Sequence, residues 1–258
     1  MSDIRSPLKN RPLRIPGQSV QENIDRLLGD KVVTYVLAIT ASLALALSEW
    51  FRWYSNTPPS PLWVTAGALI VILFSLIKLR DAKKKLKALK LGRDGERIVA
   101  EMINMLRGNG AIIFHDVQAP GFNVDHLIIA RQGIFVVETK TYSKRTGAKV
   151  VFDGKELLAD GRRPDRDPIA QVRAISDWVA NILRESTGKC FPVKPVVVFP
   201  GWWVNPIREQ GGSDVWVLNP EPLPKFVMNE PMKIAEDDFR LAVFHMARIA
   251  RSEVSATV

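Results

Sequence analysis

Residues 124–140 read VDHLIIARQGIFVVETK, two runs rich in β-branched and aromatic residues on either side of a polar turn at 131–133. Such runs, bounded by turn residues, are typical of paired β-strands. If the first two residues of the turn form the tip of a hairpin, counting back along both strands places Asp125 opposite Glu138. The stretch therefore predicts an antiparallel hairpin with two carboxylates facing each other across it.

The open end of this hairpin predicts a functional site. Alternation of side chains along a strand puts Glu138 and Lys140 on the same face as Asp125, and Thr139 on the other. Two carboxylates directly opposite one another destabilise a sheet unless a cation lies between them. Mg²⁺ takes oxygen ligands, so Asp125, Glu138 and the Thr139 backbone carbonyl are candidate ligands. Lys140 is then placed to hold water, or to stabilise developing phosphate charge, in phosphodiester hydrolysis.

A helix precedes the hairpin and carries a carboxylate on its buried face. Apolar residues recur at helical spacing between 98 and 106, and a Gly-Asn-Gly turn ends the pattern. Glu96 lies three residues before Val99 and seven before Ile103, so its side chain points along the face that packs on the domain. Because a buried carboxylate needs a partner, Glu96 is a further candidate site residue.

The rest of this region has the pattern of a mixed α/β domain. Further strands are expected at 111–117, 193–200 and 215–218, and an amphipathic closing helix is expected at 236–251. The sequence therefore predicts a central sheet flanked by helices.

The ordered motifs of this domain resemble those of the nuclease-related domain, the NERD family, within the PD-(D/E)xK nuclease superfamily. The matching segments are Gly95-Glu96, VDHLII at 124–129, GIFVVETK at 133–140 and DPIAQ at 167–171. Asp167 stands where the family has asparagine, and Val124 stands in place of the proline in the superfamily's name. The resemblance covers residues 92–218.

The resemblance implies a restriction-endonuclease-like fold, a metal-dependent nuclease site and a nucleic-acid substrate, with DNA as the first candidate. The implied metal is Mg²⁺ or Mn²⁺, held by Asp125, Glu138 and the Thr139 backbone carbonyl, with Glu96 as an additional candidate ligand. The implied catalytic residues are Asp125, Glu138, Lys140, Glu96 and Gln171.

Gln171 also stands out by its place in a helix. Asp167 suits the N-cap and Pro168 the first helical position, and Gln171 begins the face that carries Ile175 and Trp178. An amide at the start of an apolar stripe either supports the site or bonds to nearby backbone at the helix start. The sequence leaves both interpretations open.

Two uncharged apolar runs precede the domain. Residues 32–47 read VVTYVLAITASLALAL and residues 62–77 read LWVTAGALIVILFSLI, each close to the ~20 residues that a bilayer core of ~30 Å requires. The short Pro-rich loop 55–61 makes them antiparallel, and aromatic residues gather at the ends that face each other, as in an aromatic belt: Trp50, Trp53, Tyr54 and Trp63. The runs predict two transmembrane helices at 32–51 and 62–79. A cleaved signal peptide for the first run and a buried core hairpin are the alternatives.

Basic residues flank the outer ends of both runs, and the connecting region holds only Arg52. Positive flanks are retained in the cytoplasm, so both termini and the following domain are expected there, at a bacterial-type inner membrane. Residues 78–93 hold eight basic side chains against Asp81 and carry most of the net charge of +9, so overall basicity says little about DNA. This cluster is interpreted first as a juxtamembrane helix and second as a site for anionic lipid.

The chain accordingly divides into a cytoplasmic segment at 1–31, a transmembrane hairpin at 32–79, a basic juxtamembrane segment at 80–91, a nuclease-like domain at 92–220 and a helical extension at 221–258. The single Cys190 excludes an internal disulfide. The three histidines lack the spacing of a structural zinc site.

Other residues carry weaker functional signals. Trp202 and Trp203 beside Gly201 are candidates for base stacking, although such residues more often pack in the core. The pair His115-Asp116 and His126 could assist a metal, but a histidine beside a strand carboxylate is more commonly a hydrogen-bonded structural residue.

Three interpretations of function follow from these residues. The first is a membrane-anchored, metal-dependent nuclease that needs Asp125, Glu138 and Lys140 jointly. The second is a catalytically silent module that binds nucleic acid or a partner protein at the membrane. The third makes Glu138 and Lys140 a surface ion pair, which leaves Glu96, Asp125 and Gln171 as unrelated polar residues on apolar faces. The presence of every expected site residue favours the first.

Overall fold

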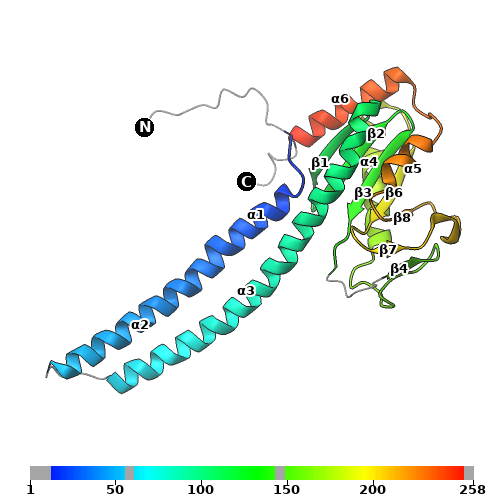
Figure 1. The fold of residues 1–258 in the computed structure, drawn as a ribbon. Coiled ribbons are helices and arrows are strands. Elements are labelled where there is room, and N and C mark those ends of the chain that lie inside the picture. The colour runs from blue at the N-terminus through cyan, green and yellow to red at the C-terminus, as the bar shows by residue number, and fades with distance from the viewer. Residues whose placement is uncertain (1–12, 56–60, 143–148, 253–258) are drawn as a thin grey trace, which may run out of the picture. The chain divides into compact units, whose positions relative to one another are not determined.

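The computed structural model describes residues 13–55, 61–142 and 149–252 (Figure 1). The chain forms two compact units, a helical unit at Ser19–Lys90 and an α/β unit that joins residues 1–18 to Leu91–Val258. Most of the expected loop at 55–61, the first twelve residues and the end of the expected C-terminal extension lie outside the described residues.

The helical unit is an antiparallel hairpin, as the sequence predicts. α1 (Gln18–Arg26) continues through a π-helical turn, η1 (Leu27–Val32), into α2 (Val33–Tyr54), and α3 (Pro61–Ile103) follows. The Trp50 indole donates a hydrogen bond to Thr65 Oγ1 at 3.0 Å, and the rings of Tyr35 and Phe74 pack edge to face at 6.4 Å. Both helices are long and apolar enough to be candidate membrane spans.

α3 is a single helix through residues that the sequence divides into a membrane span, a basic segment and a new helix. No proline interrupts residues 62–103, and the helix continues through the turn-like Asp94-Gly95 pair. It tightens into a 3₁₀ turn, η2 (Asn104–Asn109), and ends at Gly110, whose φ of 84° is left-handed. The predicted helix end is confirmed.

A five-stranded mixed sheet forms the centre of the α/β unit, in the order β1-β2-β3-β6-β8 (Figure 1). The first three strands are antiparallel, and the last two extend the sheet in parallel. The strands are β1 (Ile112–Ala119), β2 (Phe122–Ala130), β3 (Gly133–Thr139), β6 (Val193–Val198) and β8 (Trp216–Leu218).

The register of β2 against β3 is the one that the sequence predicts. Ala130 pairs with Gly133 across the two-residue tip, and the ladder ends where His126 pairs with Val137. The next position along this register brings Asp125 beside Glu138.

Helices cover both faces of the sheet. α4 (Pro168–Thr187) and α6 (Glu236–Ser252) pack on one face through residues such as Val172 and Met246. The end of α3, η2 and α5 (Leu223–Asn229) pack on the other through residues such as Ile103 and Leu223. The predicted mixed α/β architecture is confirmed, and its closing helix is α6.

A second, three-stranded sheet was not predicted. It has the order β5-β4-β7, from β4 (Lys149–Phe152), β5 (Leu157–Ala159) and β7 (Trp203–Val204). The Asn205 side chain fixes it by bonding both the N–H and the carbonyl of Phe152, at 2.8 and 2.9 Å, and the 3₁₀ turn η3 (Ile207–Glu209) follows. Because these strands have two to four residues, their hydrophobic alternation is too short to detect in the sequence.

Candidate active site

Glu138, Lys140 and Gln171 form a closed hydrogen-bonded triangle. Glu138 is only 4% exposed, and its Oε1 accepts from Lys140 Nζ at 2.6 Å and from Gln171 Nε2 at 2.8 Å. Lys140 Nζ also donates to Gln171 Oε1 at 2.9 Å. The Gln171 amide thus bonds the other two residues and not nearby backbone at the helix start, because the Asp167 side chain already caps α4.

Asp125 joins this set at the point where β2 and β3 separate. Its Oδ2 accepts a hydrogen bond from the backbone N–H of Thr139 at 2.8 Å. The pairing of β2 with β3 has already ended at His126 and Val137, so the Asp125 side chain takes the place of a strand carbonyl. The residue as a whole is half-buried, and burial of its carboxylate, followed by the charges of Glu138 and Glu96, raises its pKa well above the usual range. The Asp125 carboxylate therefore lies in a site with an excess of negative charge.

Glu96 approaches the same site from α3, as its helical position predicts. It is buried, and burial raises its pKa to about 7, with further raising by the Asp116 and Glu138 carboxylates. A hydrogen bond from the Gly17 backbone and the charge of Lys140 oppose that rise. The pKa of Glu138 is also raised by burial, although Lys140 lowers it. The carboxylates of Glu96, Asp125 and Glu138 thus share one site, in which Lys140 neutralises only part of their negative charge.

Asp116 is a buried neighbour that sequence reasoning considered only as the residue beside His115. It is 2% exposed, and its backbone is left-handed at φ 50°. Arg14 Nε donates to Asp116 Oδ2 at 2.7 Å, and Asn123 Nδ2 donates to Oδ1 at 3.2 Å. The sequence does not assign Arg14 or Gly17 to the site: both precede the apolar runs, and Arg14 counts there only as one of the basic residues that flank the first run.

The donor chemistry of the site fits a hard divalent cation. In the described ranges 13–55, 61–142 and 149–252, no three side chains of the His, Cys, Asp or Glu type converge as a metal-binding group. Two carboxylates are nevertheless enough for Mg²⁺, which commonly completes its shell with water and substrate phosphate oxygens. Burial raises the pKa of both Asp125 and Glu138, and the charges of Glu138 and Glu96 raise that of Asp125 further, so a cation here would favour the ionised carboxylates.

The Thr139 carbonyl faces the same side as Asp125. The Lys140 N–H donates to the Val198 carbonyl on β6, whereas the Thr139 N–H points the other way, toward Asp125 on β2. Within a strand, the N–H and carbonyl of one residue point to the same neighbouring strand. The carbonyl that the sequence suggests as a ligand is therefore directed to the carboxylate side of the site.

The order and spacing of these residues coincide with a known family. Residues 91–200 match the family model described as the nuclease-related domain, NERD. These residues form a NERD domain. An uncharacterized protein of Bacillus anthracis is 32% identical over an alignment of 78 residues, and the match covers 28% of this chain and 37% of that protein. No solved structure matches the chain.

The histidines of the NERD domain bond to each other. His115 Nδ1 and His126 Nδ1 lie 2.9 Å apart. Burial, with a smaller effect of Arg107, lowers the pKa of His115 to about 4, and burial also lowers the pKa of His126. Two neutral imidazoles in contact fit the structural role, with one ring donating to the other.

An open pocket of about 460 Å³ lies between the small sheet of the NERD domain and Tyr142, two residues beyond Lys140. Burial, then the charges of Asp165 and Glu138, raises the pKa of Tyr142, so its hydroxyl lies within the electrostatic influence of the site. The pocket is lined by Tyr142, Ala159, Asp160, Arg162, Arg163, Pro164, Asp165 and Trp202.

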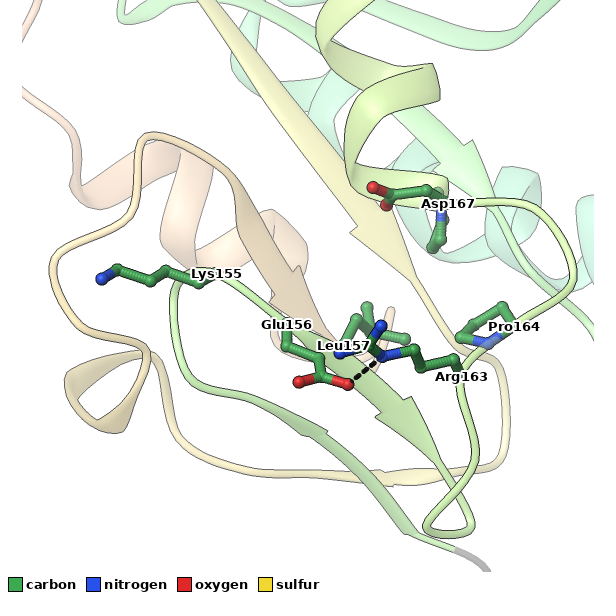
Figure 2. Close-up of a pocket in the computed structure, with 7 residues that line it drawn as sticks. Lys155, Glu156, Leu157, Arg163, Pro164 and Asp167 are labelled. Carbon is green, nitrogen blue, oxygen red and sulfur yellow. Dashed lines mark hydrogen bonds and ion pairs between the residues drawn. The ribbon is translucent and has the colours of Figure 1, made fainter.

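A second pocket, of about 370 Å³, continues past Arg163 to the first turn of α4 (Figure 2). Figure 2 shows the Arg163 guanidinium reaching Glu156 on its wall, with Asp167 farther along. Arg163 thus lines both pockets, and Arg162 lines the first and pairs with Ala159 at the edge of the small sheet.

The two tryptophans proposed for base stacking are not equivalent. Trp202 is 4% exposed and packs its ring on Tyr142, which agrees with the core alternative. Trp203 is exposed, but Lys149 Nζ lies 5.6 Å from the centre of its ring. The half-buried ring of Tyr142 is therefore the better placed aromatic surface near the site.

Proposed function

We propose that this chain is a membrane-anchored nuclease that hydrolyses phosphodiester bonds with Mg²⁺ or Mn²⁺, and that DNA is its substrate. The observation that carries the proposal is the bonded set of Glu138, Lys140 and Gln171 beside Asp125 within a NERD domain. A surface ion pair does not account for this set, because Glu138 is almost fully buried and also bonded to an amide. An amide that bonds both members of an ion pair fixes the orientation of the two charged groups, as a catalytic site requires.

The metal would be held by the Asp125 and Glu138 carboxylates, with the Thr139 carbonyl and Glu96 as further candidate ligands. When bound, such an ion neutralises phosphate charge and lowers the pKa of water. Hydrolysis forms a bond from a water oxygen to phosphorus and breaks the bond to one sugar oxygen, which leaves with a proton. The Lys140 ammonium group stabilises the negative charge that develops on the phosphate. Gln171 keeps the ammonium group and the Glu138 carboxylate in position.

The proposed fold of the domain is restriction-endonuclease-like. The support for this is that the β2–β3 hairpin carries the acidic residues and Lys140 at the end where its strands separate. Helices on opposite faces of the sheet, α3 and α4, each add one residue, Glu96 and Gln171.

The membrane part of the proposal rests on the surface of the hairpin. Its apolar side chains are turned outward, and Leu45 is 62% and Ile70 71% exposed. Such surfaces are costly in water and favourable in lipid. With basic residues at both outer ends, the hairpin would cross an inner membrane twice and leave the NERD domain in the cytoplasm.

A pocket of about 340 Å³ in the helical unit supports the anionic-lipid part of the proposal. Three cations and one acid line it, beside the start of α2, so a headgroup phosphate would meet a net positive site. Its lining residues are Asn23, Arg26, Leu27, Asp30, Lys31, Lys85 and Leu89.

A catalytically silent, membrane-tethered binding module is the second candidate. The observation that favours it is that no three metal-ligating side chains converge among the described residues. It predicts nucleic-acid binding that needs neither Asp125 nor Lys140.

The test uses the purified full-length chain in lipid nanodiscs with single- and double-stranded DNA and RNA, in Mg²⁺, Mn²⁺ or EDTA. Asp125→Asn and Lys140→Gln remove one charge each from the site. Asp177→Asn and Lys225→Gln are matched controls, because both residues are exposed and lie on other surfaces.

Metal-dependent cleavage that is lost in the two site variants and kept in the two controls supports the nuclease. Absence of cleavage with every substrate and metal, together with unchanged binding in Asp125→Asn, would instead select the silent module.

A further inference from the structure

A segment that precedes the membrane hairpin reaches the carboxylates of the site. The Arg14 side chain is only 8% exposed and the Asp116 side chain 3%, and their ion pair of 2.7 Å joins positions 102 residues apart. Residues 91–200 match the NERD family, so Arg14 lies outside the matched domain. Removing either member of this buried ion pair would leave the other charge buried without a partner, which is strongly destabilising. The folded chain therefore depends on this contact between two distant positions.

Asp116 is the neighbour of Asp125 in the register of β1 against β2. On the β1–β2 ladder, His115 pairs with His126 and Val117 with Val124, so Asp116 lies opposite Asp125. Its left-handed φ of 50° is uncommon for a strand residue and has to be maintained by the contacts around it. The Arg14 and Asn123 bonds to its carboxylate are such contacts.

Gly17 makes a second connection from the same segment. Its backbone N–H donates to the Glu96 carboxylate. Its own φ is left-handed, at 69°, and an added Cβ would lie 3.0 Å from Arg93 Cγ, so a larger residue would be strained and crowded here. Residues 14 and 17 thus bond to two carboxylates: Asp116, opposite Asp125, and Glu96, whose charge acts on Asp125.

We infer that residues 13–17 complete the site and that Arg14 is a positioning residue that acts through Asp116. The inference rests on the proposed function, since the site it completes is the proposed nuclease site. Arg14 neutralises Asp116, the carboxylate whose charge acts most strongly on Glu96, and this lets Asp116 and Glu96 be buried near each other. Without the guanidinium, Asp116 turns toward water and takes the adjoining part of β1 with it.

The test compares the full-length chain in nanodiscs with its Arg14→Gln, Arg14→Lys and Arg14→Gln/Asp116→Asn variants. Arg248→Gln, on the exposed side of α6, is the matched control. Hydrogen exchange is followed in EDTA by mass spectrometry, and cleavage is measured in Mg²⁺. Arg14→Gln should speed exchange in residues 112–126 by about tenfold or more and leave β6 and β8 protected.

Cleavage should fall by a similar factor in Arg14→Gln and recover largely in Arg14→Lys, which restores the positive charge. The double variant should recover the slow exchange of residues 112–126, because a neutral amide needs no guanidinium.

Two results would overturn the assignment: exchange in Arg14→Gln that equals the wild type, or loss of protection in β6 and β8 as well, which would make Arg14 a support of the whole domain. A wild-type chain that never cuts, with faster local exchange in Arg14→Gln, would refute the proposed nuclease and leave the positioning role standing.

Discussion

Gln171 and Glu138 lie 33 positions apart, yet the Gln171 amide nitrogen donates to Glu138 Oε1 at 2.8 Å while its oxygen accepts from Lys140. One side chain on α4 thereby sets the orientation of both charged residues at the end of β3. The amide can do this because Asp167 caps the helix and fixes its first turn.

Replacing Gln171 should therefore impair catalysis more than folding. Gln171→Leu removes both hydrogen bonds at similar volume, and cleavage should fall by roughly 10–100-fold, the usual effect of losing a partner of a metal-site residue. Melting temperature and cleavage rate in Mg²⁺ are the measurements. A variant that cuts at the wild-type rate would show that Lys140 and Glu138 need no third partner.

Gly95 is required for the close approach of α3 to the end of β3. A Cβ at Gly95 would lie 2.1 Å from Thr141 Cγ2, whereas one at Gly92 would lie 3.9 Å from Thr141 Oγ1. Gly95→Ala should displace Thr141 beside Lys140, lower stability by about 1–3 kcal/mol and reduce cleavage. Gly92→Ala, on the same helix, should be tolerated.

Thr141→Ser removes the methyl group with which the new Cβ collides, and it should restore activity to Gly95→Ala. Thermal melting and cleavage assays of the single and double variants give the answer. If the double variant is as inactive as Gly95→Ala, the collision with Thr141 is not the cause.

The stability of the α/β unit should depend on pH through Glu96. Burial raises the pKa of Glu96 from 4.5 to about 7, so between these values the folded protein keeps a proton that the unfolded chain has released. Stability should fall as pH rises through this window, with a contribution from Glu96 of at most about 3 kcal/mol. Melting in EDTA from pH 4.5 to 8 should show a shallower slope for Glu96→Gln. Parallel slopes would contradict the raised pKa.

Divalent metal should stabilise the folded chain through Asp125 and Glu138. At 100 times its dissociation constant, a ligand that binds only the folded state adds about 2.7 kcal/mol. Mn²⁺ should raise the melting temperature of the wild type and of Asp177→Asn, but not of Asp125→Asn or Glu138→Gln. Because protons compete with the metal at carboxylates of raised pKa, the shift should grow as the pH rises. A shift that survives both site variants would place the metal elsewhere.

The arginines beside Tyr142 should contribute to nucleic-acid binding. Arg162 and Arg163 line the pocket next to the site, and each phosphate contact that is lost should lower the slope of log K against log salt by about 0.7–0.9. Fluorescence anisotropy with labelled single-stranded DNA in EDTA compares Arg162→Ala and Arg163→Ala with Arg248→Ala. Equal slopes in all three variants would exclude this pocket from the binding surface.

The sequence predicts the hairpin of the site well because the residues that determine it are close together along the chain. A two-residue turn fixes the register, and the register alone brings Asp125 beside Glu138. The buried position of Glu96 follows from helical periodicity in the same way. Gln171 could be placed at a helix start, but which of its two roles applied depended on a contact with another element.

Other parts of the site depend on contacts that no periodicity encodes. β4 pairs with β7 through only two residue pairs, Lys149–Trp203 and Val150–Val204, so the small sheet has no repeating pattern to detect. The left-handed backbone of Asp116 is set by its surroundings, since aspartate alone seldom adopts it in a strand.

The unit that contains the site is discontinuous along the chain, with one piece ending at Gln18 and the other beginning at Leu91. The helical hairpin is therefore an insertion into this unit, not an appendage in front of it. Arg14 is synthesised long before Asp116, and their contact can close only after the intervening helices have been made. Closing a loop of this length has an entropic cost that a covalently continuous domain would avoid. Folding of the α/β unit should consequently finish after translation of β1, with the two ends of the inserted hairpin already brought together.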